Sequence, residues 1–242
     1  MDYGLQLYSV RDMAEKDFEG TLKAVADLGY EFVEPAGFFG HSAEQVKEWL
    51  DKYNLKVSGT HSSFEDLEND FEGTVKYHKT IGNTRYIIPG RDTSTRAALD
   101  VTVELIYKYQ PMLAEHGIEL GYHNHHREFS LNLNAIYPNL YFKEKTNVKF
   151  EIDTFWAFIA KRDPVTVLEE YRERLIGCIH LKDGLSYPGI AGRALGEGAA
   201  PVRDVIAKAK DMGLKMIVES EGLNPTGIEE VGRCAEFLKK NG

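Results

Sequence analysis

The 242-residue sequence predicts a single (β/α)₈ barrel, and three observations support that fold class. Short apolar segments alternate with longer segments of helical periodicity along the chain, a pattern typical of a parallel sheet covered by helices. Eight such pairs can be counted, and eight strands close into a barrel. An open doubly wound sheet is disfavoured because no Gly-x-Gly-x-x-Gly turn follows a strand. No linker interrupts the chain, so residues 1–242 are expected to form one domain.

The first half of the chain is expected to hold four strands and four helical segments. The strands are the short apolar segments 4–8, 32–34, 55–59 and 85–88. Phe18, Leu22 and Val25 recur at helical spacing and predict a helix at 18–28, while Ser42 predicts the start of another at 43–53. The remaining helices are predicted at 64–81 and at 94–116, where Pro111 is expected to kink or split the helix.

The second half continues the alternation. Strands are expected at 118–123, 148–153, 176–181 and 215–218. Helices are expected at 163–174, where Pro164 occupies the first turn, and at 201–212 and 227–240. Segment 124–147 is expected to form a loop with a short helix, and the glycine-rich segment 183–199 a mobile loop over the barrel mouth.

Composition excludes several classes of protein. The formal net charge of −9 argues against a nucleic-acid partner, which would require a basic face. Two cysteines far apart, Cys178 and Cys234, predict no disulfide framework and fit a reducing compartment. No apolar run reaches the roughly 18–20 residues of a membrane span, and the first residues do not resemble a signal peptide. A cytoplasmic protein without a membrane partner is expected.

Ionisable and polar residues collect where the predicted strands end, while the strand interiors stay apolar. The active sites of such barrels lie at these C-terminal strand ends. The alternation of side chains along a strand predicts that Asp153, His180 and Glu219 point into the barrel mouth and converge. The other polar residues at or just beyond strand ends are Gln6, Glu34, His61, His123, His125, Glu128 and Lys182.

A cluster of carboxylates with an imidazole predicts one bound divalent metal. Half-buried charges cost free energy when unpaired, and one cation offsets several of these costs. The ligand types favour Mn²⁺ first, then Mg²⁺, Co²⁺ or Zn²⁺. Such a metal can chelate a hydroxyl and a carbonyl of a polyol and stabilise an enediolate, while a neighbouring carboxylate moves the proton.

The strand-end motifs resemble those of the sugar phosphate isomerase/epimerase family, the xylose isomerase-like TIM barrels. The resemblance spans essentially the whole chain and rests on the order of its motifs. These are GLQLYSVRD, SGTHSSFEDL, GYHNHHREF, FEIDTFWAF, CIHLKDG, LGEG and IVESEG. The resemblance implies a metal-dependent isomerase or epimerase acting on a sugar or keto-sugar.

The family binds one metal through a Glu, an Asp, a His and a second Glu, and the resemblance carries the last three to Asp153, His180 and Glu219. The position of the first Glu looks like Gly121 here, a departure from the family pattern. Glu128 in the following loop looks like its replacement, and His123 or His125 could take its place. With Glu128 as a ligand, Glu128 and Glu219 are the candidates for moving the substrate proton.

The resemblance also implies substrate contacts. Lys182 could neutralise an oxyanion or hold an anionic group, or it could pair with Asp183 at the rim. Trp156 could stack on a sugar or simply pack. His61 and His125 could bind hydroxyls, with His123 in the same wet cleft. Gln6 and Glu34 are expected in the pocket wall.

Three other functions remain open from the sequence. The same enolate chemistry would serve a dehydratase or lyase of a keto-sugar or keto-inositol. A nuclease of the endonuclease IV type shares the barrel but needs more metal ligands and a DNA-binding face. A non-catalytic sugar-binding barrel is the third. The chain is short for the family, which leaves open a homo-oligomer.

Overall fold

The computed structural model describes residues 3–242, and its centre is a nearly closed barrel of parallel strands. The nine strands pair in the order β3-β2-β1-β11-β8-β7-β6-β5-β4, and β3 and β4 are two parts of the third strand position. The predicted fold class is confirmed. The strands are β1 (Tyr3–Gln6), β2 (Phe32–Glu34), β3 (Lys56–Val57), β4 (Thr60–His61), β5 (Arg85–Ile88), β6 (Glu119–His123), β7 (Lys149–Asp153), β8 (Leu175–Leu181) and β11 (Lys215–Val218).

The third strand is interrupted at Ser58 and Gly59, between β3 and β4. β3 pairs with β2, whereas β4 pairs with β5, so this strand joins the two ends of the sheet. A Cβ at Gly59 would lie 2.7 Å from Ile87 Cδ1, so a larger residue would require the Ile87 side chain to shift. His61, at the end of β4, lines a cavity at the barrel mouth.

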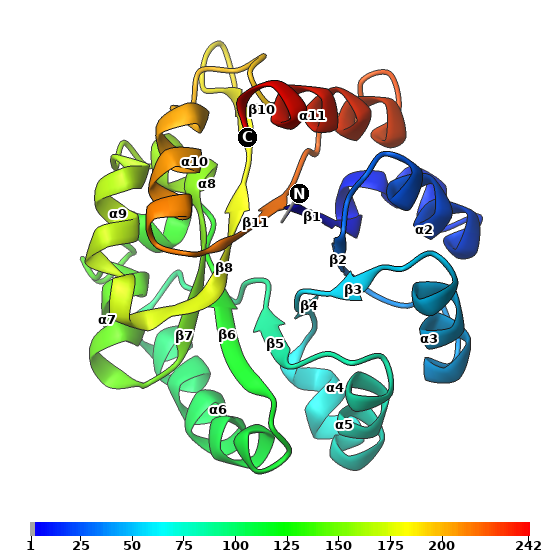
Figure 1. The fold of residues 1–242 in the computed structure, drawn as a ribbon. Helices are drawn as coiled ribbons and strands as arrows, with labels where there is room; N and C mark the ends of the chain where they lie inside the picture. The colour runs from blue at the N-terminus through cyan, green and yellow to red at the C-terminus, as the bar shows by residue number, and fades with distance from the viewer. Residues whose placement is uncertain (1–2) are drawn as a thin grey trace.

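Helices form an outer ring around the strands (Figure 1). Large apolar side chains fill the space between the ring and the sheet, and a second cluster of Ile87, Ile176, Cys178 and Ile217 fills the barrel interior. No helix among residues 3–242 is long and apolar enough to cross a membrane. The helices are α1 (Arg11–Ala14), α2 (Phe18–Asp27), α3 (Ala43–Lys52), α4 (Phe64–Asn69), α5 (Phe71–Thr80), α6 (Arg96–Glu115), α7 (Pro138–Lys145), α8 (Thr154–Ile159), α9 (Pro164–Glu170), α10 (Val202–Asp211) and α11 (Gly227–Asn241).

One helix prediction was wrong, and for another the structure excludes one of two alternatives. The helix expected at 64–81 is divided at Asp70, which has an extended φ of −155° and caps α5 by accepting from the Gly73 amide. Pro111 does not split α6, because its ring lies on the exposed side of the helix, where water can satisfy the freed carbonyl. The expected cap at Ser42 is present and forms a capping box with Gln45.

Some elements were not predicted. Three short 3₁₀ helices follow β1, β6 and α9, at Leu7–Val10, His126–Phe129 and Arg172–Arg174. The glycine-rich segment contains an antiparallel hairpin of β9 (Asp183–Leu185) and β10 (Ala191–Arg193). The Asp183 carboxylate closes the base of this loop by accepting from the amides of Gly184, Gly196, Gly198 and Ala200.

Candidate metal centre

Four buried side chains meet at the C-terminal mouth of the barrel: His123, Asp153, His180 and Glu219. They come from the ends of β6, β7 and β8 and from the residue after β11, and one potential ligand atom of each lies within 4.8 Å of the others. The His180 Nδ1 atom lies 3.4 Å from Glu219 Oε2 and 3.9 Å from Asp153 Oδ2. His123 Nε2 lies 3.7 Å from Asp153 Oδ2. The structure therefore brings together the three residues that strand alternation predicted to converge, with His123 beside them.

Three of these ligand atoms lack a hydrogen-bond partner although they are buried: His123 Nε2, Asp153 Oδ2 and His180 Nδ1. Buried polar atoms in native proteins nearly always have a partner. The opposite ring nitrogens do have one, since His180 Nε2 donates to Glu34 Oε1 at 2.8 Å and His123 Nδ1 lies 3.3 Å from the Pro89 carbonyl oxygen. These bonds leave the lone pairs of His123 Nε2 and His180 Nδ1 facing the carboxylates, the arrangement found in metal-binding histidines. The buried cluster could hold a metal.

Asp153 serves two purposes at once. Its Oδ1 atom accepts from the Trp156 amide at 2.9 Å and caps α8. Its Oδ2 atom faces the cluster without a partner. Asn124 fixes the backbone of Asp153 by accepting from its amide at 3.1 Å and donating to its carbonyl at 3.2 Å. The carboxylate is thus held in one orientation.

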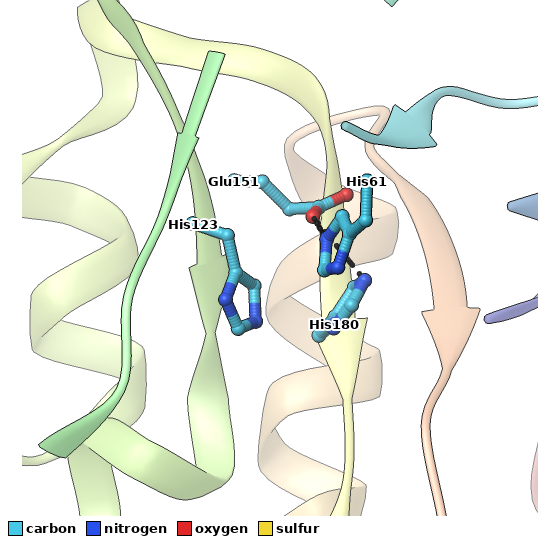
Figure 2. A group of neighbouring side chains, drawn as sticks. All are labelled: His61, His123, Glu151 and His180. Carbon is cyan, nitrogen blue, oxygen red and sulfur yellow. Dashed lines mark hydrogen bonds and ion pairs between the residues drawn. The ribbon is translucent and has the colours of Figure 1, made fainter. Parts of the chain in front are cut away.

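A second layer of carboxylates lies directly beneath. Glu151 Oε2 lies 2.9 Å from His61 Nε2 and 3.2 Å from His180 Nε2, and Figure 2 shows these side chains with His123 beside them. Glu34 accepts from Gln6 Nε2 at 2.8 Å. Cys178 lies a layer deeper and donates its thiol to Glu151 Oε1 at 3.3 Å. This layer supports His180 and His61 from below.

The pKa shifts in the cluster differ from residue to residue. Burial raises the pKa of Asp153 to about 6, with Glu219 adding to the rise and Lys182 opposing it. Burial would lower the pKa of His180, but Glu151, Glu34 and Glu219 raise it well above its usual value. Burial and the neighbouring imidazoles of His180 and His61 hold the pKa of His123 well below its usual value. Without a metal, the surrounding carboxylates favour a proton, and with it a positive charge, on the His180 imidazole. A divalent cation bound at His180 Nδ1 would supply this positive charge instead.

The Lys182 ammonium is paired with two carboxylates. It donates to Glu219 Oε2 at 3.1 Å and to the Glu221 carboxylate, and it lies 4.6 Å from the centre of the Trp156 ring. Burial would raise the pKa of Glu219, but Lys182 and His180 hold it well below its usual value. Asp183, the alternative partner, instead binds the amides of the glycine-rich loop. Lys182 therefore keeps Glu219 ionised.

A cavity of about 520 Å³ opens above the cluster. Its size is typical of a small-molecule site. Among the residues predicted for substrate or metal, His61, His123, His125 and Glu219 line it. The rest of its wall is formed by Tyr8, Ala36, Gly37, Ser62, Ser63, Asp66, Pro89 and Glu221.

Other predicted substrate residues lie away from this wall. Gln6 and Glu34 are completely buried in the lower layer, where they hold one another and His180. The Trp156 ring packs near His125 and His126, with ring centroids 5.6 and 5.5 Å away, and its Nε1 atom is buried without a partner.

The structure does not bring Glu128 into the cluster. Its Oε2 atom accepts from the His125 amide at 2.9 Å and its Oε1 atom lies 3.5 Å from the Tyr122 hydroxyl, so the carboxylate organises the loop after β6. It belongs to none of the potential metal-ligand groups formed by residues 3–242.

Gly121, at the position that resembles the family's first Glu, leaves little space for a side chain. A Cβ there would lie 2.6 Å from Ile176 Cδ1 and 3.2 Å from Ile87 Cγ1. The barrel interior is filled at this position, and His123, two residues later on the same face of β6, reaches the cluster instead.

Sequence reasoning missed Glu151 and Glu221. Glu151 shares a strand face with Asp153, and this alternation was the available signal, but it does not say how deep in the barrel the side chain lies. Glu221 follows β11 in a loop, and no periodicity marks it.

Comparisons with known proteins agree with the barrel fold. A family model described as xylose isomerase-like TIM barrel matches residues 22–241. A sugar phosphate isomerase/epimerase from Parabacteroides distasonis ATCC 8503 has a TM-score of 0.83 at 23% identity, covering 98% of this chain and 93% of that one. The probable 3-DHS dehydratase AsbF from Bacillus anthracis has a TM-score of 0.78 at 15% identity, covering 100% of both chains.

A D-allulose 3-epimerase from Methylomonas sp., in complex with D-allulose, has a TM-score of 0.72 at 16% identity, covering 99% of this chain and 96% of that one. At these identities the likeness demonstrates a shared fold. No curated protein sequence matches the chain significantly. Because the family model extends over most of its length, the chain belongs to the xylose isomerase-like TIM barrel family.

Proposed function

We propose that this protein is a divalent-metal-dependent isomerase or epimerase of a sugar or keto-sugar. The observation that carries the proposal is the set of three buried, unpartnered ligand atoms on His123, Asp153 and His180 that face one another. Two members of the cluster, His123 and Glu219, also line a cavity large enough for a small polyol. A metal held by the cluster would lie beside this cavity.

The proposed ligands are His123 Nε2, Asp153 Oδ2, His180 Nδ1 and a Glu219 carboxylate oxygen. In this assignment His123 replaces Glu128, because the Glu128 carboxylate is engaged by the His125 amide. Two imidazoles with two carboxylates form a mixed nitrogen and oxygen set, for which we propose Mn²⁺, with Co²⁺ or Zn²⁺ as competitors. The metal would supply Lewis-acid polarisation of a carbonyl and a neighbouring hydroxyl.

Glu219 is the proposed base. Its carboxylate lines the cavity, and Lys182 keeps it ionised, so it can accept the proton from the carbon next to a substrate carbonyl. His61 and His125 line the same cavity and are placed to bind hydroxyls. Burial and the neighbouring His123 lower the pKa of His125 to about 3, so it would act as a neutral partner.

Proton exchange in deuterated buffer tests the proposal. Protein reconstituted with Mn²⁺ is incubated with a panel of ketoses and keto-sugars, and deuterium at the carbon next to the carbonyl is followed by NMR. We expect metal-dependent incorporation without loss of a substituent, and a fall of about 10²–10⁴-fold in Glu219→Gln. Metal content is measured in each sample, since Glu219 is also a proposed ligand.

The other outcomes discriminate between functions. Exchange accompanied by loss of water or of another leaving group would identify a dehydratase or lyase using the same base. A protein that binds metal and sugar but exchanges no proton would be a non-catalytic binding barrel.

A further inference from the structure

A second cavity of about 500 Å³ opens beside the one above the metal centre. The two share Gly37, His61, Ser62 and Asp66 in their walls, so they form adjoining compartments of one cleft. Each compartment is large enough for a small ligand by itself. The second one, the side compartment, extends away from the metal centre toward α5.

The walls of the side compartment are built from segments that are fixed to one another. Phe38, in the loop between β2 and α3, packs on Tyr77 of α5 with ring centroids 4.4 Å apart. The Tyr77 hydroxyl donates to the His41 carbonyl at 2.9 Å and ties the same loop to the helix. Both rings line the compartment. It is therefore a preformed hollow with an aromatic side.

Carboxylates line both compartments of the cleft, together with hydroxyl and imidazole groups. Asp66, Asp70 and Thr74 line the side compartment, and Glu219 and Glu221 line the compartment above the metal centre. No lysine or arginine is found among the described residues that line either compartment. The nearby Lys182 is 1% exposed and paired with two carboxylates. Asp66 and Asp70 form no ion pair with another described residue, so an anionic group in the side compartment would meet their negative charge.

We propose that the substrate is an uncharged carbohydrate of two units, a ketose unit at the metal centre and a second neutral ring in the side compartment. This rests on the proposed function and deepens it by naming the substrate class. The aromatic rings of Phe38 and Tyr77 offer an apolar face for a sugar ring, and the carboxylates of Asp66 and Asp70 accept from hydroxyls. A simple sugar phosphate does not fit the charge of the cleft.

Calorimetric binding to the Mn²⁺-loaded protein tests the proposal with defined probes. These are D-fructose, fructose 6-phosphate and three glucosyl-fructoses that differ in linkage, namely turanose, maltulose and isomaltulose. We expect at least one glucosyl-fructose to bind at least ten times more tightly than D-fructose, and fructose 6-phosphate to bind more weakly than D-fructose.

Thr74→Trp would fill the side compartment, since Thr74 lines only that part of the cleft. Thr74→Trp should abolish the tighter binding of the glucosyl-fructose relative to D-fructose. It should change the affinity for D-fructose by no more than about twofold. Thr80→Trp is the matched control, because Thr80 lies on the same helix and lines a separate surface hollow. Phe38→Ala provides a second variant, and it should weaken the glucosyl-fructose selectively.

Three results would overturn the two-unit substrate: no glucosyl-fructose binds more tightly than D-fructose, the Thr74→Trp and Phe38→Ala variants affect both probes equally, or fructose 6-phosphate binds most tightly. These results are separable from failure of the proposed function. A protein that lacks proton exchange yet binds a glucosyl-fructose through the side compartment would refute the enzyme and support the binding site.

Discussion

His180 and Glu34 are joined by a hydrogen bond of 2.8 Å between Nε2 and Oε1, and both side chains are completely buried. The bond fixes the imidazole so that Nδ1 faces Asp153 and Glu219. A carboxylate behind a metal-binding histidine sets its tautomer and raises its basicity. Glu34 is therefore a positioning residue for the proposed metal, rather than a wall of the substrate pocket.

The first prediction follows from this bond. Glu34→Gln keeps the shape of the side chain but removes the nearer of two carboxylate charges behind His180, so Mn²⁺ affinity should fall about 10–100-fold. Competition with a chelating dye measures it. Glu65→Gln is the control, because Glu65 forms an exposed ion pair with Arg91. This variant should leave Mn²⁺ affinity unchanged. Equal affinities for Glu34→Gln and the unmodified protein would contradict the supporting role.

The second prediction separates the two candidates for the first ligand. Asp153→Asn and His123→Ala should each reduce bound Mn²⁺ from about one per chain to near zero, because each removes an unpartnered ligand atom. Glu128→Gln should retain the metal, since Gln can still accept from the His125 amide. Elemental analysis after gel filtration gives the stoichiometry. Metal loss in Glu128→Gln with retention in His123→Ala would restore Glu128 as a ligand.

The third prediction concerns the filled position in β6. Gly121→Ala would push a methyl group against Ile176, and overpacking of this kind should lower the free energy of unfolding by about 1–3 kcal/mol. Urea denaturation measures the change. Gly232→Ala in α11 is the control, because the nearest atom to its added Cβ is Leu28 Cδ2 at 3.6 Å. That variant should be neutral or gain about 0.5–1 kcal/mol from helix propensity. A Gly121→Ala protein as stable as the parent would show that β6 can shift.

The fourth prediction is a pH dependence of stability from His78, which lies outside the metal centre. Burial lowers its pKa to about 4, opposed by Asp66, and its Nδ1 accepts from the Asn83 amide group at 3.1 Å. Because the unfolded chain binds the proton more tightly, the stability due to neutral His78 is complete above about pH 6.5 and is lost as the pH falls toward 4. A difference of this size corresponds to about 3 kcal/mol.

Replacing His78 by Gln should remove this contribution. We expect the free energy of unfolding of His78→Gln to fall less steeply than that of the parent between pH 6.5 and 4, with parallel curves outside this window. Denaturant titrations at several pH values provide the comparison. Identical slopes inside the window would mean that the pKa of His78 is the same in the folded and unfolded protein.

The sequence anticipated much of the candidate site because strand alternation is a local property. Asp153, His180 and Glu219 stand at strand ends, and parallel strands bring such ends to one mouth. Glu128 and His123 illustrate what local patterns omit. Which of the two residues can serve as a metal ligand depends on whether its side chain is already hydrogen-bonded. The His125 amide that donates to Glu128 is close to it only in the folded loop, so the sequence does not reveal this bond.

By itself, the sequence determined the barrel, the order of its strands and the end of the barrel where the ionisable residues meet, because periodicity and chain order specify these features. Only the tertiary structure decided which side chains are buried beneath others. Glu34 and Glu151 lie under the cluster, His123 enters it, and a side chain at Gly121 would press on Ile176. Depth in a barrel depends on register and on packing between strands distant in sequence, and no single segment encodes either.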